Sequence, residues 1–198
     1  MGTVKSLLLG MCFVLGACTS QTSTVQTTEK GTQWEWQNGT IVVKTPERPA
    51  GQKSVLGLTT PKLEAVRVGF VGLGMRGPGA VERFTYIPGT QVVALCDYEE
   101  ARADKCQELL KKASMPKAAV YSGDKGYEEL CKRDDIDLVY IAADWLHHFP
   151  VAKCALENGK NVAIEVPSAM NLQECWDLIN LSESTRKHCF ILENCCYD

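Results

Sequence analysis

The residues between 72 and 77 have the spacing of a loop that binds phosphate groups. Gly72, Gly74 and Gly77 directly follow a short apolar run and open a stretch with helical periodicity. The first glycine permits a tight turn, the second lets the main chain approach a pyrophosphate, and the third lets helix and strand pack closely. Free amides at the start of the helix would then face the phosphates. The expected cofactor-binding residues of this loop are Gly72, Gly74, Met75, Arg76 and Gly77.

An aspartate follows the next apolar run at a distance that suits a ribose contact. Asp97 stands 25 positions after Gly72 and comes directly after the run 91–96. A carboxylate there accepts hydrogen bonds from the adenosine ribose hydroxyls and repels a 2′-phosphate, so the two features together favour NAD over NADP. The alternatives are a tight turn in some other α/β protein for the glycines and a helix cap before Glu99 for Asp97.

These residues need a sheet that brings the ends of its strands to one edge. From residue 66 onwards apolar runs alternate with segments of helical periodicity, and several runs are apolar on both faces, as buried parallel strands are. The expected strands are 66–71, 91–96, 118–121, 138–142, 161–165 and 189–193, and the expected helices are 76–86, 99–113, 126–133, 147–157 and 172–186. This alternation predicts an α/β fold, a doubly wound parallel Rossmann sheet of order 3-2-1-4-5-6.

The carboxyl ends of the last three strands carry a second group of candidates, because ligands of such sheets bind beyond those ends. The fourth strand runs into "AADWLHHFP", the fifth into "IEVPSAM" and the sixth into "ENCCYD". The candidate residues at these ends are Trp145, His148, Glu165, Val166, Pro167 and Asn194. Two interpretations of His148 stay open, a contact with cofactor or sugar and a helix cap, and His147 is expected to be structural.

The first residues of the chain have the pattern of an export signal. Lys5 precedes an apolar or small run of about 12 residues, which is too short to span a bilayer as a helix. Its end, "LGAC", resembles the bacterial lipobox, in which the signal is cut before the cysteine and that cysteine is acylated. We therefore expect a lipoprotein signal over residues 1–18 with a lipidated Cys18. The alternative is a buried strand or helix near the start of the fold.

The next segment, residues 19–64, is expected to be a tether and an irregular N-terminal arm. It is rich in Thr, Gln, Gly and Pro and shows no sustained periodicity. Within it "WEWQNGTIVV" predicts a small hairpin with Asn38-Gly39 as its turn. Residues 65–198 are expected to form the NAD-binding domain.

Composition narrows the classes of partner. A net charge of −3 without any run of Lys and Arg gives no indication of a nucleic-acid partner. The ten cysteines include no C-x-x-C pair, and most lie in apolar strand or helix patterns. We interpret them mainly as small buried hydrophobic residues rather than as disulfides, and we expect no metal site.

The motifs together resemble the Gfo/Idh/MocA family of nicotinamide enzymes, which act on sugars and related polyols. The resemblance covers residues 64–198 and rests on the glycine loop, Asp97, "HFPVA" after the fourth strand and an E-x-P segment after the fifth. In that family the last segment is usually Glu-Lys-Pro, and its lysine is a catalytic acid/base. Here it is Glu165-Val166-Pro167. Valine cannot move a proton, so the family's ordinary dehydrogenase mechanism is not expected.

Longer stretches closely resemble one branch, glycoside hydrolase family 109, the NAD-dependent α-N-acetylgalactosaminidases. They are "GFVGLGMRGPG", "DWLHH", "GKNVAIEVPSAM", "ECWDLINLSESTRKHC" and "LENCCYD". The resemblance implies transient oxidation of the sugar at carbon 3, elimination of the glycosidic oxygen, addition of water and re-reduction. It assigns Tyr197 as the catalytic acid/base near carbon 2, and the alternative is a tyrosine packed on the sheet edge. It also implies that Trp145 lines the nicotinamide pocket and that the other candidates at the strand ends bind the cofactor.

The resemblance also sets expectations about the whole protein. It implies a C-terminal α/β domain that forms much of the sugar site, so we expect this chain alone to be inactive. With the export signal it implies a bacterial glycosidase, lipid-anchored in the cell envelope, that removes terminal α-N-acetylgalactosamine from glycans with a resident NAD. A homo-oligomer is expected of the full-length form. The alternatives are an exported sugar oxidoreductase of the wider family and a non-catalytic binding lipoprotein.

Overall fold

The computed structural model describes residues 26–27, 33–44 and 46–193, which fall into two units, one before residue 45 and one from residue 45 onwards. The first unit holds a small antiparallel sheet in the order β1-β2-β3, formed by β1 (Gln26–Thr27), β2 (Gln33–Gln37) and β3 (Thr40–Val43). The predicted hairpin is confirmed. Its turn residues have positive φ, 50° at Asn38 and 80° at Gly39, as a tight two-residue hairpin turn requires.

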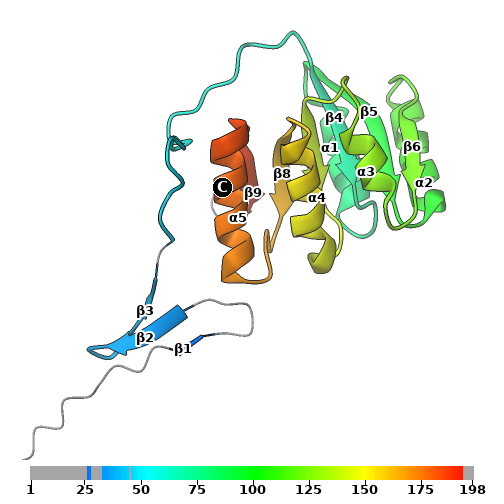
Figure 1. Ribbon diagram of the computed structural model, residues 1–198. Coiled ribbons are helices and arrows are strands. Elements are labelled where there is room, and N and C mark those ends of the chain that lie inside the picture. The colour runs from blue at the N-terminus through cyan, green and yellow to red at the C-terminus, as the bar shows by residue number, and fades with distance from the viewer. Residues whose placement is uncertain (1–25, 28–32, 45, 194–198) are drawn as a thin grey trace, which may run out of the picture. The chain divides into compact units, whose positions relative to one another are not determined.

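The second unit is built on a parallel sheet of six strands in the order β6-β5-β4-β7-β8-β9 (Figure 1). Counted from the first of them, this is the predicted order 3-2-1-4-5-6. The strands are β4 (Val66–Val71), β5 (Thr90–Asp97), β6 (Ala119–Ser122), β7 (Leu138–Ile141), β8 (Asn161–Glu165) and β9 (Cys189–Leu192). The helices are α1 (Gly77–Phe84), α2 (Glu100–Lys112), α3 (Gly126–Cys131), α4 (Trp145–Glu157) and α5 (Leu172–Thr185).

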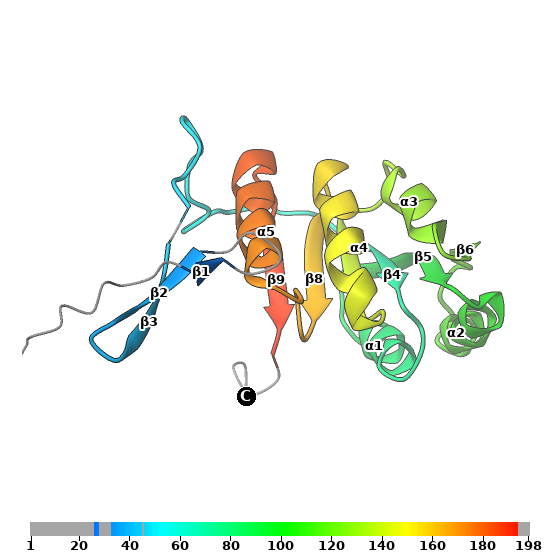
Figure 2. The same ribbon diagram turned by 60° about the horizontal axis from the view of Figure 1, so that its bottom comes forward.

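Helices cover the two faces of the sheet unequally. Figure 2 shows α1 and α2 on one side and α3, α4 and α5 on the other. Alternate residues of each strand supply the two cores, as strand geometry requires. Val68 and Phe70 pack with α1 and α2, whereas Val71 and Val139 pack with α3, α4 and α5. Every pair of neighbouring strands is parallel, so the carboxyl ends of all six lie at one edge.

Side chains cap the first turns of α4 and α5, and the start of α4 differs from the predicted one whereas the start of α5 agrees with it. α4 begins at Trp145, two residues before the predicted start, because the Asp144 carboxylate accepts a hydrogen bond from the Leu146 amide at 3.0 Å. At the start of α5, Asn171 accepts from the Glu174 amide at 3.1 Å. The α4 cap matters for function, because it sets the direction in which the first turn of that helix leaves the strand edge.

The arm from residue 46 to residue 64 is irregular, as predicted, and is tied to α5. The Arg48 guanidinium donates to both carboxylate oxygens of Glu183, at 2.8 and 2.9 Å, and Gln52 donates to Glu183 and Asn180. Arg186, just after α5, donates to the carbonyls of Lys53 and Ser54. Glu183 is 3% exposed, so this buried carboxylate is neutralised by a residue of the arm.

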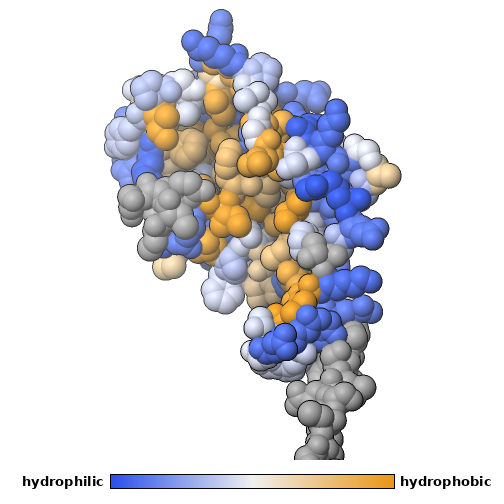
Figure 3. Space-filling view, turned by 90° about the vertical axis from the view of Figure 1, so that its left-hand side faces the viewer, coloured by the Kyte–Doolittle hydropathy of each residue, from blue (hydrophilic) through white to orange (hydrophobic). Residues whose placement is uncertain are grey.

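Apolar side chains gather at the open edge of the sheet beside α5. Phe190 and Ile191 on β9 and Ile179 on α5 are 42–48% exposed. Figure 3, which faces this side of the molecule, shows apolar surface among hydrophilic residues. Within the described residues no helix is long and apolar enough to cross a membrane.

The described cysteines mostly follow the prediction that they are buried. Cys96, Cys106 and Cys131 are buried, and Cys154 and Cys189 are partly buried. Cys175 is the exception, because it lies on an exposed position of α5. Cys12, Cys18, Cys195 and Cys196 lie outside the described residues.

Candidate functional site

The connection between β4 and α1 is shaped by close main-chain contacts. Gly72 has φ +90°, and a Cβ built on it would lie 2.3 Å from the Ala143 nitrogen. A Cβ on Gly77 would lie 2.2 Å from the Gly72 carbonyl oxygen. Both positions therefore require glycine, the first for the turn and its crossing by the β7–α4 connection, and the third for packing of helix on strand.

The second glycine has a different surrounding. A Cβ on Gly74 would meet only the Arg102 guanidinium, at 3.4 Å, so the space around that Cβ position is otherwise open. α1 begins three residues later, has no acidic residue in its first turn and has no side-chain cap at Arg76. Its first amides and the positive end of its dipole are thus available to an anion.

Asp97 anchors the glycine loop from the end of β5. The residue is 6% exposed, and its Oδ2 accepts from the Leu73 amide at 2.6 Å while Oδ1 accepts from the Glu99 amide at 2.9 Å. The Arg102 guanidinium lies 3.6 Å from Oδ1. α2 begins at Glu100 and its cap residue is Glu99, so Asp97 is not the cap residue of that helix. Each carboxylate oxygen has a second lone pair with which it can accept from a ribose hydroxyl.

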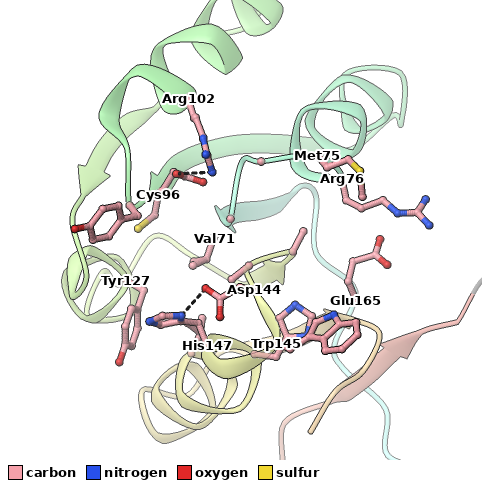
Figure 4. Close-up of a pocket in the computed structure, with 18 of the residues that line it drawn as sticks. Val71, Met75, Arg76, Cys96, Arg102, Tyr127, Asp144, Trp145, His147 and Glu165 are labelled. Carbon is pink, nitrogen blue, oxygen red and sulfur yellow. Dashed lines mark hydrogen bonds and ion pairs between the residues drawn. The ribbon is translucent and has the colours of Figure 1, made fainter. Parts of the chain in front are cut away.

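A cavity of about 430 Å³ runs along the carboxyl edge of the sheet from β6 to β8. Figure 4 shows Cys96, Arg102 and Tyr127 toward one end and Arg76, Trp145 and Glu165 toward the other. The lining residues lie at the ends of the strands or in the segments that follow them. They are Val71, Gly72, Gly74, Met75 and Arg76 from β4 onwards, Cys96, Asp97, Tyr98 and Arg102 from β5 onwards, Gly123, Asp124 and Tyr127 after β6, Ala142, Ala143, Asp144, Trp145, His147, His148 and Val151 after β7, and Glu165 and Val166 from the end of β8. The cavity has the elongated placement that a dinucleotide needs in this fold.

His147 is held by two acids at the cavity wall. Its Nδ1 is 2.6 Å from Asp144 Oδ2, and its Nε2 is 3.4 Å from Asp124 Oδ1. Burial alone would raise the pKa of Asp144, but hydrogen bonds from His147 and from the Leu146 amide outweigh it and lower the pKa below its usual value. His147 therefore orders the first turn of α4, in line with the structural role predicted for it, while also lining the cavity.

His148 is directed by a main-chain carbonyl. It is 1% exposed, and its Nδ1 lies 2.7 Å from the Pro167 oxygen. A carbonyl only accepts, so Nδ1 carries the proton and Nε2 of the neutral ring is an acceptor. Nε2 has no hydrogen-bond partner within the described part of the chain. Because Asp144 caps α4, the helix-cap interpretation of His148 is wrong, and the imidazole instead links α4 to the loop after β8.

Glu165 ends β8, and a hydrogen bond from the neighbouring strand β7 holds its side chain. The carboxylate accepts a hydrogen bond from the Tyr140 hydroxyl at 2.9 Å, and the residue is 9% exposed. Val166, the next residue, lines the cavity and is 42% exposed, and its bond to Pro167 is cis. The side chain at the position where the wider family carries a lysine is thus an aliphatic group at the cavity surface.

The predicted site residues fall into three groups by their place in the structure. Those that line the cavity are Gly72, Gly74, Met75, Arg76, Asp97, Trp145, His148, Glu165 and Val166. Gly77 and Pro167 lie behind it, the first packed on Gly72 and the second bonded through its carbonyl to His148. Asn194, Tyr197 and Cys18 lie outside the described residues, so their roles remain predictions.

Sequence reasoning missed several lining residues at the β5–β6 end. They are Tyr98, Arg102, Asp124 and Tyr127, together with Asp144 at the start of α4. Arg102 and Tyr127 lie on helices whose periodicity shows only which face is buried, and nothing local shows that they reach the strand edge. Asp144 had a signal, because an aspartate just before a helix is a common cap.

The described residues fit an NAD molecule at this edge. Gly74 leaves room for a pyrophosphate, and Asp97 is placed for the adenosine ribose. The buried Nε2 of His148 can accept a hydrogen bond from the cofactor. Among the described residues no group of His, Cys, Asp and Glu side chains is arranged to hold a metal ion.

Comparison with known proteins agrees with this geometry. The model of the oxidoreductase family with an NAD-binding Rossmann fold, Gfo/Idh/MocA, matches residues 66–192. The solved structure of a myo-inositol dehydrogenase from Lactobacillus casei, with NAD(H) and myo-inositol, is similar with a TM-score of 0.57 and 24% identity, covering 65% of this chain and 36% of that one. At that identity the likeness concerns the fold.

Curated relatives are much more similar in sequence. Glycosyl hydrolase family 109 protein 4 of Phocaeicola vulgatus is 80% identical over 100% of this chain and 39% of its own length. Glycosyl hydrolase family 109 protein 1 of Bacteroides thetaiotaomicron is 58% identical over 98% of this chain and 41% of its own. The chain thus spans about two fifths of the length of these relatives. It belongs to the Gfo/Idh/MocA family as an NAD-binding Rossmann domain, and over its whole length it resembles the N-terminal part of family 109 glycosyl hydrolases.

Proposed function

We propose that the protein is an NAD-dependent glycoside hydrolase that removes terminal α-N-acetylgalactosamine from glycans. Its similarity to proteins named glycosyl hydrolase family 109 supports a glycosidase, and the residues at the strand edge suit NAD. The observation that carries the proposal is Val166. Its side chain stands at the cavity surface beside Glu165, and it offers no proton-transfer group where the wider family offers a lysine.

This substitution argues against a simple sugar dehydrogenase. Oxidation of an alcohol needs a base at the reacting hydroxyl, and a valine cannot be that base. When bound, NAD supplies a transient oxidation of the sugar that is reversed within the same turnover. The protein must then move a proton next to the oxidised carbon, and the resemblance assigns that step to Tyr197. A tyrosine with an unperturbed pKa of about 10 needs nearby positive charge or hydrogen bonds to act as a base.

The described residues have supporting roles in this proposal. The amides of α1 and the open face at Gly74 bind the pyrophosphate, and Asp97 binds the adenosine ribose. His148 offers the acceptor Nε2 and holds the loop after β8 through Pro167. Trp145, 60% exposed at the start of α4, supplies an apolar wall that excludes water from the nicotinamide end.

Placement in the cell envelope is part of the proposal. The lipobox-like segment before Cys18 supports export and acylation, and a glycan substrate outside the cytoplasm suits both. Each turnover restores the cofactor, so one bound NAD suffices where no pool replenishes it. Incorporation of labelled fatty acid tests the anchor, and analytical ultracentrifugation tests the homo-oligomer proposed for the full-length form.

The deciding experiment follows two signals in one assay. The protein, expressed from its complete gene, is given an aryl α-N-acetylgalactosaminide while phenol release and the absorbance of NADH are recorded. We expect phenol release with no net NADH, and a decrease of about 10²- to 10⁴-fold in Tyr197→Phe. The control is Tyr121→Phe. Tyr121 lies on β6 and does not line the cavity, and the substitution removes a hydroxyl that accepts a hydrogen bond from Arg133. Steady NADH accumulation would instead make the protein a sugar oxidoreductase, and neither signal would favour a binding lipoprotein.

A further inference from the structure

Three aromatic rings pack against one another near Glu165, and one of them, that of Tyr140, carries a hydroxyl group. Tyr140 on β7 lies 5.1 Å from Phe70 on β4 and 5.7 Å from Phe84 on α1, between ring centroids, and Phe70 and Phe84 are 5.2 Å apart. Tyr140 is 6% exposed. A phenylalanine would fill the same space, so the hydroxyl is the part of this side chain that packing does not explain.

The Tyr140 hydroxyl is bonded to a carboxylate. It donates a hydrogen bond to Glu165 Oε1 at 2.9 Å. Burial and the Glu165 charge raise the pKa of Tyr140 to about 12, so the phenol keeps its proton and remains a donor at neutral pH. A neutral donor that faces a carboxylate makes a charge-assisted hydrogen bond, which is stronger than a bond between neutral groups.

The Glu165 carboxylate has no ion pair within the described residues. Arg102, another lining cation, is engaged elsewhere, since it contacts Asp97 and Glu99. Arg76 lies at the same end of the cavity as Glu165, and no ion pair joins the two (Figure 4). A fixed negative charge therefore faces the cavity next to the aliphatic side chain of Val166.

The place of this charge along the cofactor follows from the other end of the site. Asp97 takes the adenosine ribose and the start of α1 takes the pyrophosphate, so the rest of NAD must extend along the edge to β7 and β8. Glu165 ends β8 and thus stands at the nicotinamide end. The oxidised nicotinamide ring is a cation, and the reduced ring is neutral.

We propose that Tyr140 is a positioning residue that fixes the Glu165 carboxylate at the nicotinamide end, and that this charge makes the site bind NAD⁺ more tightly than NADH. A charge pair a few ångströms apart in a partly buried site is strong enough for a preference of about tenfold. The inference deepens the proposed function and rests on it in one respect, because an enzyme that restores its cofactor must begin each turnover with NAD⁺.

The test compares the dissociation constants of NAD⁺ and NADH by titration calorimetry. In the unmodified protein we expect NADH to bind about tenfold more weakly. In Glu165→Gln the two constants become nearly equal, and in Tyr140→Phe, which keeps the ring, the ratio falls to about threefold. Tyr121→Phe, the matched loss of a hydroxyl on β6, keeps the original ratio.

Several outcomes would overturn the inference. An unchanged ratio in Glu165→Gln would show that the carboxylate does not sense the charge of the ring. Equal weakening of both ligands would make Glu165 a contact to the ribose instead, and no binding of either ligand to the unmodified protein would remove the site itself. Each of these results is independent of whether the aryl glycoside is hydrolysed, so failure of the glycosidase proposal would be seen separately.

A second measurement needs no ligand. Tyrosine labelled with ¹³C at Cζ reports whether each phenol is protonated, and Tyr140→Phe identifies the resonance of Tyr140. In Glu165→Gln we expect Tyr140 to ionise at a lower pH than in the unmodified protein, because the raising effect of the carboxylate is lost while burial remains. If its titration does not move, the hydrogen bond to Glu165 does not form in solution and the positioning role is wrong.

Discussion

Main-chain groups set the geometry on the β4–β5 side of the cofactor site, whereas side chains set it on the β7–β8 side. Gly72 crosses the backbone of the β7–α4 connection, Gly77 packs on Gly72, and Asp97 is bonded to two amides. On the other side, two hydrogen bonds hold the side chains in place, one from Tyr140 to Glu165 and one from His148 to the Pro167 carbonyl.

The difference separates what binds any dinucleotide from what chooses the chemistry. A phosphate and a ribose are the same in every NAD enzyme, so a rigid main-chain cradle serves them all. The nicotinamide end needs groups that set charge and proton transfer, and side chains can change there without disturbing the loop. Val166 illustrates this freedom, since it follows β8 directly and takes no part in the pairing of that strand with β7 or β9.

The largest expected effect comes from breaking the main-chain side. Gly72→Ala forces a Cβ to within 2.3 Å of the Ala143 nitrogen at a φ of +90°. Neither backbone can give way without moving β4 or β7, so we expect a loss of unfolding free energy of about 3 kcal/mol or more. Urea denaturation followed by circular dichroism measures it.

Gly74→Ala is the matched control for that variant. Its Cβ would meet only the mobile end of the Arg102 side chain, at 3.4 Å. We expect unfolding free energy to change by less than about 1 kcal/mol, while NAD binds at least roughly tenfold more weakly because a methyl group stands where the pyrophosphate approaches. Equal stability losses in the two variants would show that close main-chain contact is not what fixes the loop.

The same contrast explains how much could be predicted from the sequence. The strand order, the hairpin at Asn38-Gly39, the turn at Gly72 and the close packing at Gly77 depend on local patterns, and the structure confirms them. The phosphate contact expected at Gly74 stays a prediction. The contacts of the other side join residues far apart in the chain. Tyr140 and Glu165 are separated by 25 positions, and neither stretch shows that the two side chains meet. The start of α4 was predicted two residues late because the cap at Asp144 was missed.

His148 offers a medium-sized test of the side-chain side. His148→Asn can keep a nitrogen donor for the Pro167 carbonyl but lacks an equivalent of Nε2, whereas His148→Ala loses both. We expect the alanine variant to lose about 2–3 kcal/mol of unfolding free energy and the asparagine variant clearly less. NAD should bind roughly five- to tenfold more weakly in both, as measured by calorimetry. Binding by the asparagine variant equal to that of the unmodified protein would mean that Nε2 does not face the ligand.

The smallest effect is expected where the two sides join, at the edge opposite the cavity. Asp137, just before β7, accepts from the Arg67 amide at 2.9 Å and from its guanidinium at 2.9 and 2.7 Å, which ties the start of β4 to β7. These hydrogen bonds outweigh burial and lower the pKa of Asp137.

A lowered native pKa fixes the sign of the pH dependence. The contribution of Asp137 to stability is fully present above the unfolded pKa of about 4 and is lost as the pH falls through the lower native pKa. Asp137→Asn should therefore show a shallower loss of unfolding free energy between about pH 4 and pH 2. At pH 7 its affinity for NAD should stay within about twofold, because the substitution lies at the far edge of the sheet from Asp97 and Glu165. A large loss of affinity would instead show that the two sides of the site are coupled through the sheet, and the separation between a main-chain cradle and a side-chain end would not hold.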